Sequence, residues 1–257
     1  MPEYFESPKL KLARAKKYVD DLERERDRFI DEHPWSHVVE PNLDGSRKEY
    51  KIKFTRDFPD TFGDFTSNAL QNLRSALDHA ANASARAAGV SDPRSAYFPF
   101  GNDPKGLEDG IKGRCKDILP DIVTVIRGFK PYRTGNPNPI LWAINNAANV
   151  DKHAIVHPMA GCVESIRLSS PDANCRPVLI FPPRWDGAKN EIVYAVSAPE
   201  FSPEYNVDIK VDIALAEIGV VDSHPAVGLL KAMIHEVERV LMGIEAETRR
   251  LFPNAFL

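Results

Sequence analysis

The hydrophobic residues between Phe62 and Ala87 recur at steps of three and four, which is the spacing of one face of an α-helix. Alanine fills most of these positions, so a second helix can approach this face closely. The positions are Phe65, Ala69, Leu73, Ala76, Ala80, Ala83 and Ala87. We therefore expect the rest of the fold to be organised around this helix.

Three further segments have the same period. Ser7-Pro8 and Asn138-Pro139 each resemble a helix start, with a capping side chain followed by proline at the first helical position. The four predicted main helices span residues 7–32, 62–88, 138–153 and 225–250. Between Asp92 and Gly135 the chain is rich in proline and glycine, which predicts irregular backbone with one short helix over 118–126.

Residues 155–213 change to alternation of apolar and polar positions, which is typical of strands. An earlier alternation on both sides of the turn Asn42-Leu43-Asp44-Gly45 predicts a β-hairpin. Helices and strands are thus segregated along the chain, which favours an α+β fold. We expect a single domain over 1–257, a helical bundle beside an antiparallel β-sheet formed mainly by residues 155–213 plus the early hairpin.

Composition narrows the function classes only slightly. The net charge of −4 argues against a generally basic nucleic-acid coat, but it allows a local basic patch. The three cysteines include no Cys-x-x-Cys pair, which favours a reducing compartment and argues against a zinc ribbon. No apolar run has the length of a signal peptide or a membrane span. These observations predict a cytoplasmic protein with no membrane contact.

The polar side of the 62–88 helix has two edges. Asn68, Asn72, Ser75, His79, Asn82 and Arg86 follow one edge, and Gln71, Arg74 and Asp78 follow the other. Arg74 and His79 are five residues apart, or about 140° around the helix, so they flank the polar arc. Arginine, four residues, then histidine resembles the Arg-x4–6-His motif of the HEPN superfamily, whose members are helical bundles and often metal-independent ribonucleases.

This resemblance implies an endoribonuclease of a stress or defence system that acts as a homodimer on RNA, with no cofactor. It implies that Arg74 stabilises the scissile phosphate and that His79 assists proton transfer at the ribose 2′-hydroxyl or the leaving group. Asp78 would orient one of the two. Another interpretation of the same residues is structural: an Arg74–Asp78 ion pair with His79 hydrogen-bonded at a helix interface, in a non-catalytic dimeric or ligand-binding protein.

The 138–153 helix carries Asn145, Asn146 and Asn149, whose amides are unfavourable in a helix unless they find partners. We expect this helix to face a polar strip of the 62–88 helix, with Asn68, Asn72, Ser75, His79 and Asn82 as its partners. Such a seam is either a functional cleft or a device that fixes helix pairing. The candidate substrate-binding residues are Asn72, Asn145, Asn149, Lys152, His153, Lys130 and Arg133.

Two further hypotheses concern basic residues and metals. The basic residues from Lys105 to Arg133 would contact an RNA backbone if the ribonuclease interpretation holds. The segments 72–82, 98–100, 130–133 and 141–153 resemble a group of uncharacterised bacterial proteins, which suggests that His79, Asp151 and His153 share one site. These three residues, with Asp78 and His157, could alternatively bind a metal ion in a metal-dependent hydrolase.

Overall fold

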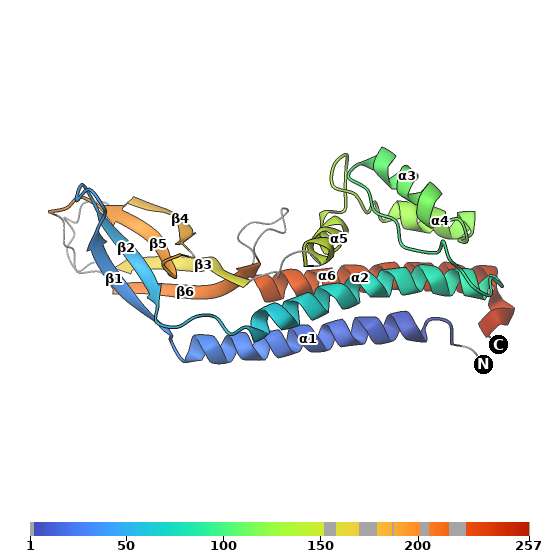
Figure 1. Ribbon diagram of the computed structural model, residues 1–257, viewed down its shortest axis with the longest axis horizontal. Coiled ribbons are helices and arrows are strands. Elements are labelled where there is room, and N and C mark those ends of the chain that lie inside the picture. The colour runs from blue at the N-terminus through green and yellow to red at the C-terminus, as the bar shows by residue number, and fades with distance from the viewer. Residues whose placement is uncertain are drawn as a thin grey trace.

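Three long helices lie side by side and form the body of the molecule (Figure 1). They are α1 (Glu6–Asp31), α2 (Thr61–Ala87) and α6 (Ala226–Leu251). The computed structural model describes residues 3–151, 158–169, 179–186, 188–200, 206–215 and 225–256. The strands gather at one end of the bundle, and both chain termini lie at the other end (Figure 1). Helices and strands are segregated, so the fold is α+β as predicted.

The alanine face of α2 is buried, as its period predicts. Ala69, Ala76 and Ala80 are completely inaccessible to solvent. These small side chains let α1 and α6 pack directly against α2. α1 runs antiparallel to α2, because Ser7 at its start contacts His79 and Phe29 near its end packs edge-to-face on Phe62. The start of α1 therefore lies beside the second half of α2.

Three shorter helices cover one side of the bundle (Figure 1). They are α3 (Pro104–Arg114), α4 (Pro120–Gly128) and α5 (Pro139–Asp151). Asn138 caps α5 as predicted, because its side-chain oxygen accepts a hydrogen bond from the Leu141 amide at 3.1 Å. The prediction that one short helix interrupts residues 92–135 was incomplete, since it missed α3.

The sequence of α3 disguises it, because Gly106, Gly110 and Gly113 weaken the helical pattern. Asp103 caps the helix by accepting a hydrogen bond from the Gly106 amide at 2.7 Å. Gly110 has a packing reason as well, because a Cβ there would come within 3.1 Å of the Phe100 carbonyl oxygen. Burial of Leu107 and Ile111 supplies the apolar face.

The predicted strands are present, but they form two antiparallel units among the described residues. A four-stranded sheet has the order β1-β2-β5-β4, and β3 pairs with β6 as a separate ribbon. The bounds are β1 Trp35–Pro41, β2 Lys48–Phe54, β3 Pro158–Ser169, β4 Leu179–Asp186, β5 Glu191–Ser197 and β6 Asn206–Leu215. The early hairpin is thus half of the larger sheet, because β2 pairs directly with β5.

Aromatic rings join the bundle to the sheet. Phe29 of α1 contacts three other rings, with centroids 5.1–6.4 Å apart. They are Phe54 of β2, Phe58 of the segment between β2 and α2, and Phe62 of α2. An ion pair between Arg26 of α1 and Asp212 of β6, 3.1 Å long and nearly buried, adds a second link. No helix within the described ranges is both long and apolar enough to cross a membrane.

Candidate functional site

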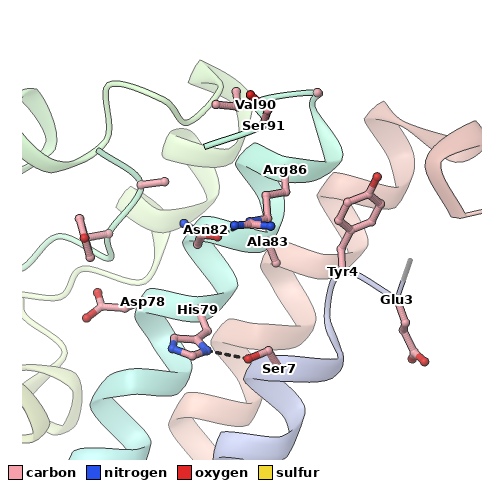
Figure 2. A pocket seen from close by; sticks show the side chains of 13 residues that line it. Glu3, Tyr4, Ser7, Asp78, His79, Asn82, Ala83, Arg86, Val90 and Ser91 are labelled. Atoms are coloured by element: carbon pink, nitrogen blue, oxygen red, sulfur yellow. Dashed lines mark hydrogen bonds between the residues drawn. The ribbon is translucent and has the colours of Figure 1, made fainter. Parts of the chain in front are cut away.

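A cavity of about 850 Å³ opens at the terminal end of the bundle (Figure 2). The second half of α2 contributes Asp78, His79, Asn82 and Arg86 to its lining. Residues at the start of the chain, including Tyr4 and Ser7, line one part, and the segment that follows α2 lines another. The cavity exists because the start of α1 and the chain after α2 meet beside the same helix.

Ser7 and His79 form the central contact of this cavity. The Ser7 hydroxyl lies 2.7 Å from Nδ1 of the His79 ring (Figure 2). The serine was expected to cap α1, but the helix begins one residue earlier, at Glu6, and its first turn has no side-chain cap. The hydroxyl is therefore available to His79. No group among the described residues hydrogen-bonds the other ring nitrogen, Nε2.

The surroundings of His79 keep its imidazole neutral at physiological pH. Desolvation lowers the pKa of His79 most, the charge of Lys11 lowers it further, and the charge of Asp78 opposes both. Lys11 lies one helical turn after Ser7 on α1. In the neutral tautomer whose Nδ1–H donates to the Ser7 hydroxyl oxygen, Nε2 is unprotonated and can accept a proton from a bound ligand.

Two more side chains give the cavity features that suit a charged, aromatic ligand. Arg86 is exposed, and its Nε donates to Asn82 Oδ1 at 3.0 Å, which leaves the rest of the guanidinium open to solvent. Tyr97 has 48% of its surface exposed. The Phe98 amide donates to Asp78 Oδ1 at 2.9 Å, and this bond fixes the backbone next to Tyr97.

Arg74 lies on a different side of α2 from His79, as their spacing predicts. Its Nη1 pairs with Asp78 Oδ1 at 2.6 Å, and its Nε donates to Asn145 Oδ1 at 3.3 Å. The guanidinium also lies 4.5 Å from the centre of the Phe100 ring. Only 13% of the side chain is exposed. Arg74 and Asp78 thus hold the 98–100 segment and α5 against α2.

The polar seam between α2 and α5 is present, but other residues form it. Gln71 donates to the Ala148 carbonyl at 3.0 Å, and Arg74 contacts Asn145. The predicted partners were wrong, because they lie on the other edge of the polar arc. Asn68 and Asn72 each donate to a backbone carbonyl one turn earlier in α2, Asn82 donates to the Pro93 carbonyl, and His79 contacts Ser7.

The other candidate binding residues do not gather at the cavity. Asn149 is exposed on α5, and Arg133 lies 5.0 Å from the Trp142 ring centre. Lys130 adopts a positive φ of 53°, and its carbonyl accepts the Asn138 amide just before α5. Lys152 and His153 lie outside the described residues. Asn145 contacts Arg74 and not His79.

The arrangement of α5 gives no support to a metal site that includes His79 and Asp151. Asn145 lies beside Arg74 and Ala148 beside Gln71, so α5 runs towards the start of α2 and away from His79. The described part of the chain contains no group of three or more histidine, cysteine, aspartate or glutamate side chains that could hold a metal ion. His153 and His157 lie outside the described residues.

Sequence reasoning missed Ser7, Lys11 and Tyr97 at this site. Ser7 was interpreted as a cap, and nothing in the sequence alone places the start of α1 beside His79. Arg86 could have been predicted from the sequence, because it follows His79 by seven residues and lies on the same edge of the helix.

Comparison with known proteins does not assign the chain to a family. It matches no family model, no curated protein and no solved structure.

Proposed function

We propose that the His79 cavity binds single-stranded RNA and cleaves it without a metal ion. The observation that supports this proposal is the neutral His79 ring, held by Ser7 at one nitrogen and unpartnered at the other, in a cavity that also contains Arg86. A volume of about 850 Å³ is large enough for a nucleotide. Cleavage of a phosphodiester by the ribose 2′-hydroxyl requires a general base that works near neutral pH and stabilisation of the charge on the phosphate.

The proposed step uses the substrate's own nucleophile. Nε2 of His79 accepts the proton of the ribose 2′-hydroxyl while its oxygen attacks the adjacent phosphorus. The bond from phosphorus to the 5′-oxygen of the next nucleotide breaks, and that oxygen takes a proton from water. The products are a 2′,3′-cyclic phosphate and a 5′-hydroxyl. Arg86 would stabilise the charge that develops on the phosphate oxygens.

In this proposal Arg74 and Asp78 are positioning residues. Asp78 accepts the Phe98 amide, and Arg74 contacts Phe100 and Asn145 of α5, so the pair fixes the cavity wall that carries Tyr97. The catalytic roles that the HEPN resemblance implies for them stay predictions, as do the homodimer and the function in stress or defence. Local order of this wall matters because proton transfer requires a ligand held to within a fraction of an ångström.

A second candidate function is nucleotide binding without cleavage. Two contacts favour it, the Arg74–Asp78 ion pair and the hydrogen bond between His79 and Ser7. A purely structural role for Arg74 and His79 predicts contacts of these two kinds. A cavity with an arginine and an exposed tyrosine could retain an anionic aromatic ligand through charge and stacking alone.

One assay separates the two candidates. Purified wild type and His79→Ala are incubated with end-labelled single-stranded RNA in excess chelator, with Asn68→Ala as a matched control on the exposed surface of α2. We expect wild type and Asn68→Ala to produce fragments with 2′,3′-cyclic phosphate ends, and His79→Ala to produce none while it still binds the RNA. Binding by all three proteins with no cleavage would favour the second candidate, and cleavage that survives in His79→Ala would contradict the first.

A further inference from the structure

The basic residues in the first half of α1 differ in whether they form ion pairs. Lys9 pairs with Glu245 at 2.9 Å, and Lys16 pairs with Glu238 at 3.0 Å, both across the groove to α6. Lys11 and Arg14 make no ion pair and no side-chain hydrogen bond with any group in the described part of the chain. Lys17 makes none either, so three positive charges on α1 are left without neutralisation by the described residues, in a protein whose net charge is −4.

Lys11 and Arg14 continue the face of α1 that begins with Ser7. Ser7, Lys11 and Arg14 are spaced by four and three residues, so they lie on one side of the helix. Because α1 packs antiparallel to α2, a count in opposite directions from the Ser7–His79 contact sets Lys11 at about the level of Ser75 and Arg14 at about the level of Asn72. The effect of Lys11 on the pKa of His79 agrees with this placement.

The result is a row of polar and basic side chains along the α1–α2 seam, which begins at the Ser7–His79 contact in the cavity. We call it the α1–α2 strip, and its members are Ser7, Lys11 and Arg14 of α1 with Asn72, Ser75 and His79 of α2. From Ser7 to Arg14 it extends about 10 Å along the helix axis. Arg86 lies at the cavity end, about two turns beyond His79.

Several carboxylates near the strip are already paired or turned away from it. Asp78 lines the cavity beside His79, but Arg74 pairs with it. Glu3 lines the cavity from the N-terminal segment, and its carboxylate points away from His79 (Figure 2). Asp21, further along α1, is paired with Arg24. The positive charges of Lys11, Arg14 and Arg86 thus act together on a ligand that lies over His79.

We infer that the α1–α2 strip holds the sugar-phosphate backbone of single-stranded RNA, so that the ligand of this site is a polymer several nucleotides long. The inference deepens the proposed function and rests on it for the cleavage step, but it concerns binding and can be tested without cleavage. Cations spaced along a groove bind successive phosphates, and the asparagine and serine side chains can donate to phosphate or ribose oxygens.

Some charges of the basic region between Lys105 and Arg133 are already neutralised, and none of its basic residues lines the cavity. Arg127 is paired with Glu108 through two bonds of 2.7 and 2.9 Å, and Lys112 is paired with Asp109. Arg133 stacks on Trp142. Lys105 and Lys116 remain exposed on this region, and they provide a control with the same change in charge.

The test is fluorescence anisotropy with a labelled oligouridylate of about twelve nucleotides and with a dinucleotide. Both carry 2′-O-methyl groups, which block cleavage. The proteins are wild type, the double variant Lys11→Gln/Arg14→Gln and the control Lys105→Gln/Lys116→Gln. We expect the α1 variant to bind the longer oligonucleotide about ten-fold more weakly at low salt, with a salt slope smaller by about 0.7 for each phosphate that is no longer neutralised. Dinucleotide binding should stay unchanged.

Three other outcomes would overturn the inference, and a fourth would refute only the proposed cleavage. Equal weakening in both double variants would mean that only total charge matters. Unchanged binding by Lys11→Gln/Arg14→Gln, with its melting temperature retained, would exclude the strip as the backbone site, as would wild type that fails to bind the longer oligonucleotide. RNA that binds through the strip but is never cleaved in its unmodified form would keep this inference and refute the proposed cleavage.

Discussion

The partly buried ring of His79 ties the candidate site to the stability of the protein. Desolvation and Lys11 lower its pKa in the folded state, whereas an unfolded histidine titrates at about 6.5. As the pH falls below about 6.5 the unfolded chain therefore takes up a proton that the folded protein resists. His79 thus stabilises the fold least in acid, and stability rises with pH through this window.

This reasoning predicts the effect of His79→Gln. The free energy of unfolding of wild type should fall between about pH 7 and pH 5, and the fall should be smaller in His79→Gln. Burial also lowers the pKa of His37, so part of the pH dependence should remain in the variant. Denaturant unfolding across this range measures both slopes. Identical slopes in the two proteins would show that His79 is not desolvated.

Arg74 offers a second test at the residue scale. Arg74→Ala removes the partner of Asp78, the contact with Asn145 and the stacking on Phe100, and we expect a loss of about 2–4 kcal/mol in the free energy of unfolding. Arg74→Lys should recover only part of this, because an ammonium group cannot reproduce the planar stacking and the forked contacts. Chemical denaturation measures the difference, and a loss below about 0.5 kcal/mol for Arg74→Ala would contradict the positioning role.

At the scale of elements, α2 depends on its small residues. Ala80→Leu should lower the free energy of unfolding by about 1–3 kcal/mol, because Ala80 is completely buried and a larger side chain must displace a neighbouring helix. Asn68→Leu introduces the same side chain at an exposed position of the same helix and should change stability little. Equal effects of the two substitutions would mean that close helix approach is unimportant here.

The sequence predicted the helices and strands better than it predicted which residues bring them into contact. Apolar periods identify α1, α2 and α6, because burial of one face repeats at a fixed interval. The same pattern does not say which polar edge of α2 meets α5, since Gln71 and Asn72 are adjacent and equally polar. Ser7 could have capped α1 or contacted another helix, and only the tertiary arrangement decides between these roles. The seam was therefore predicted correctly as a feature and wrongly in its residues.

At the scale of the whole molecule, the joint between bundle and sheet determines how the protein unfolds. Phe29, Phe54, Phe58 and Phe62 form one aromatic cluster across α1, β2 and α2, and Arg26 links α1 to Asp212 of β6. We expect a single calorimetric transition whose calorimetric and van't Hoff enthalpies agree. Two separate transitions in the wild-type protein would instead indicate two independent units.

Phe29→Ala tests the joint directly. Loss of its ring should cost about 3–5 kcal/mol and should weaken the coupling between the bundle and the sheet, so that the calorimetric transition broadens or divides. Leu12→Ala lies in α1 far from the joint and provides the matched control, with a lower melting temperature but a single transition. Division of the transition in both variants would argue against a special role for the aromatic cluster.

The proposed cleavage assigns the reacting groups to the His79 cavity and gives Arg74 a supporting role outside it. The most direct test is the single-turnover rate of RNA cleavage by His79→Ala and Arg74→Ala, measured in chelator and well below the melting temperature of either protein. We expect no cleavage by His79→Ala and substantial cleavage by folded Arg74→Ala. Cleavage by His79→Ala, or its complete loss in a fully folded Arg74→Ala, would contradict this assignment.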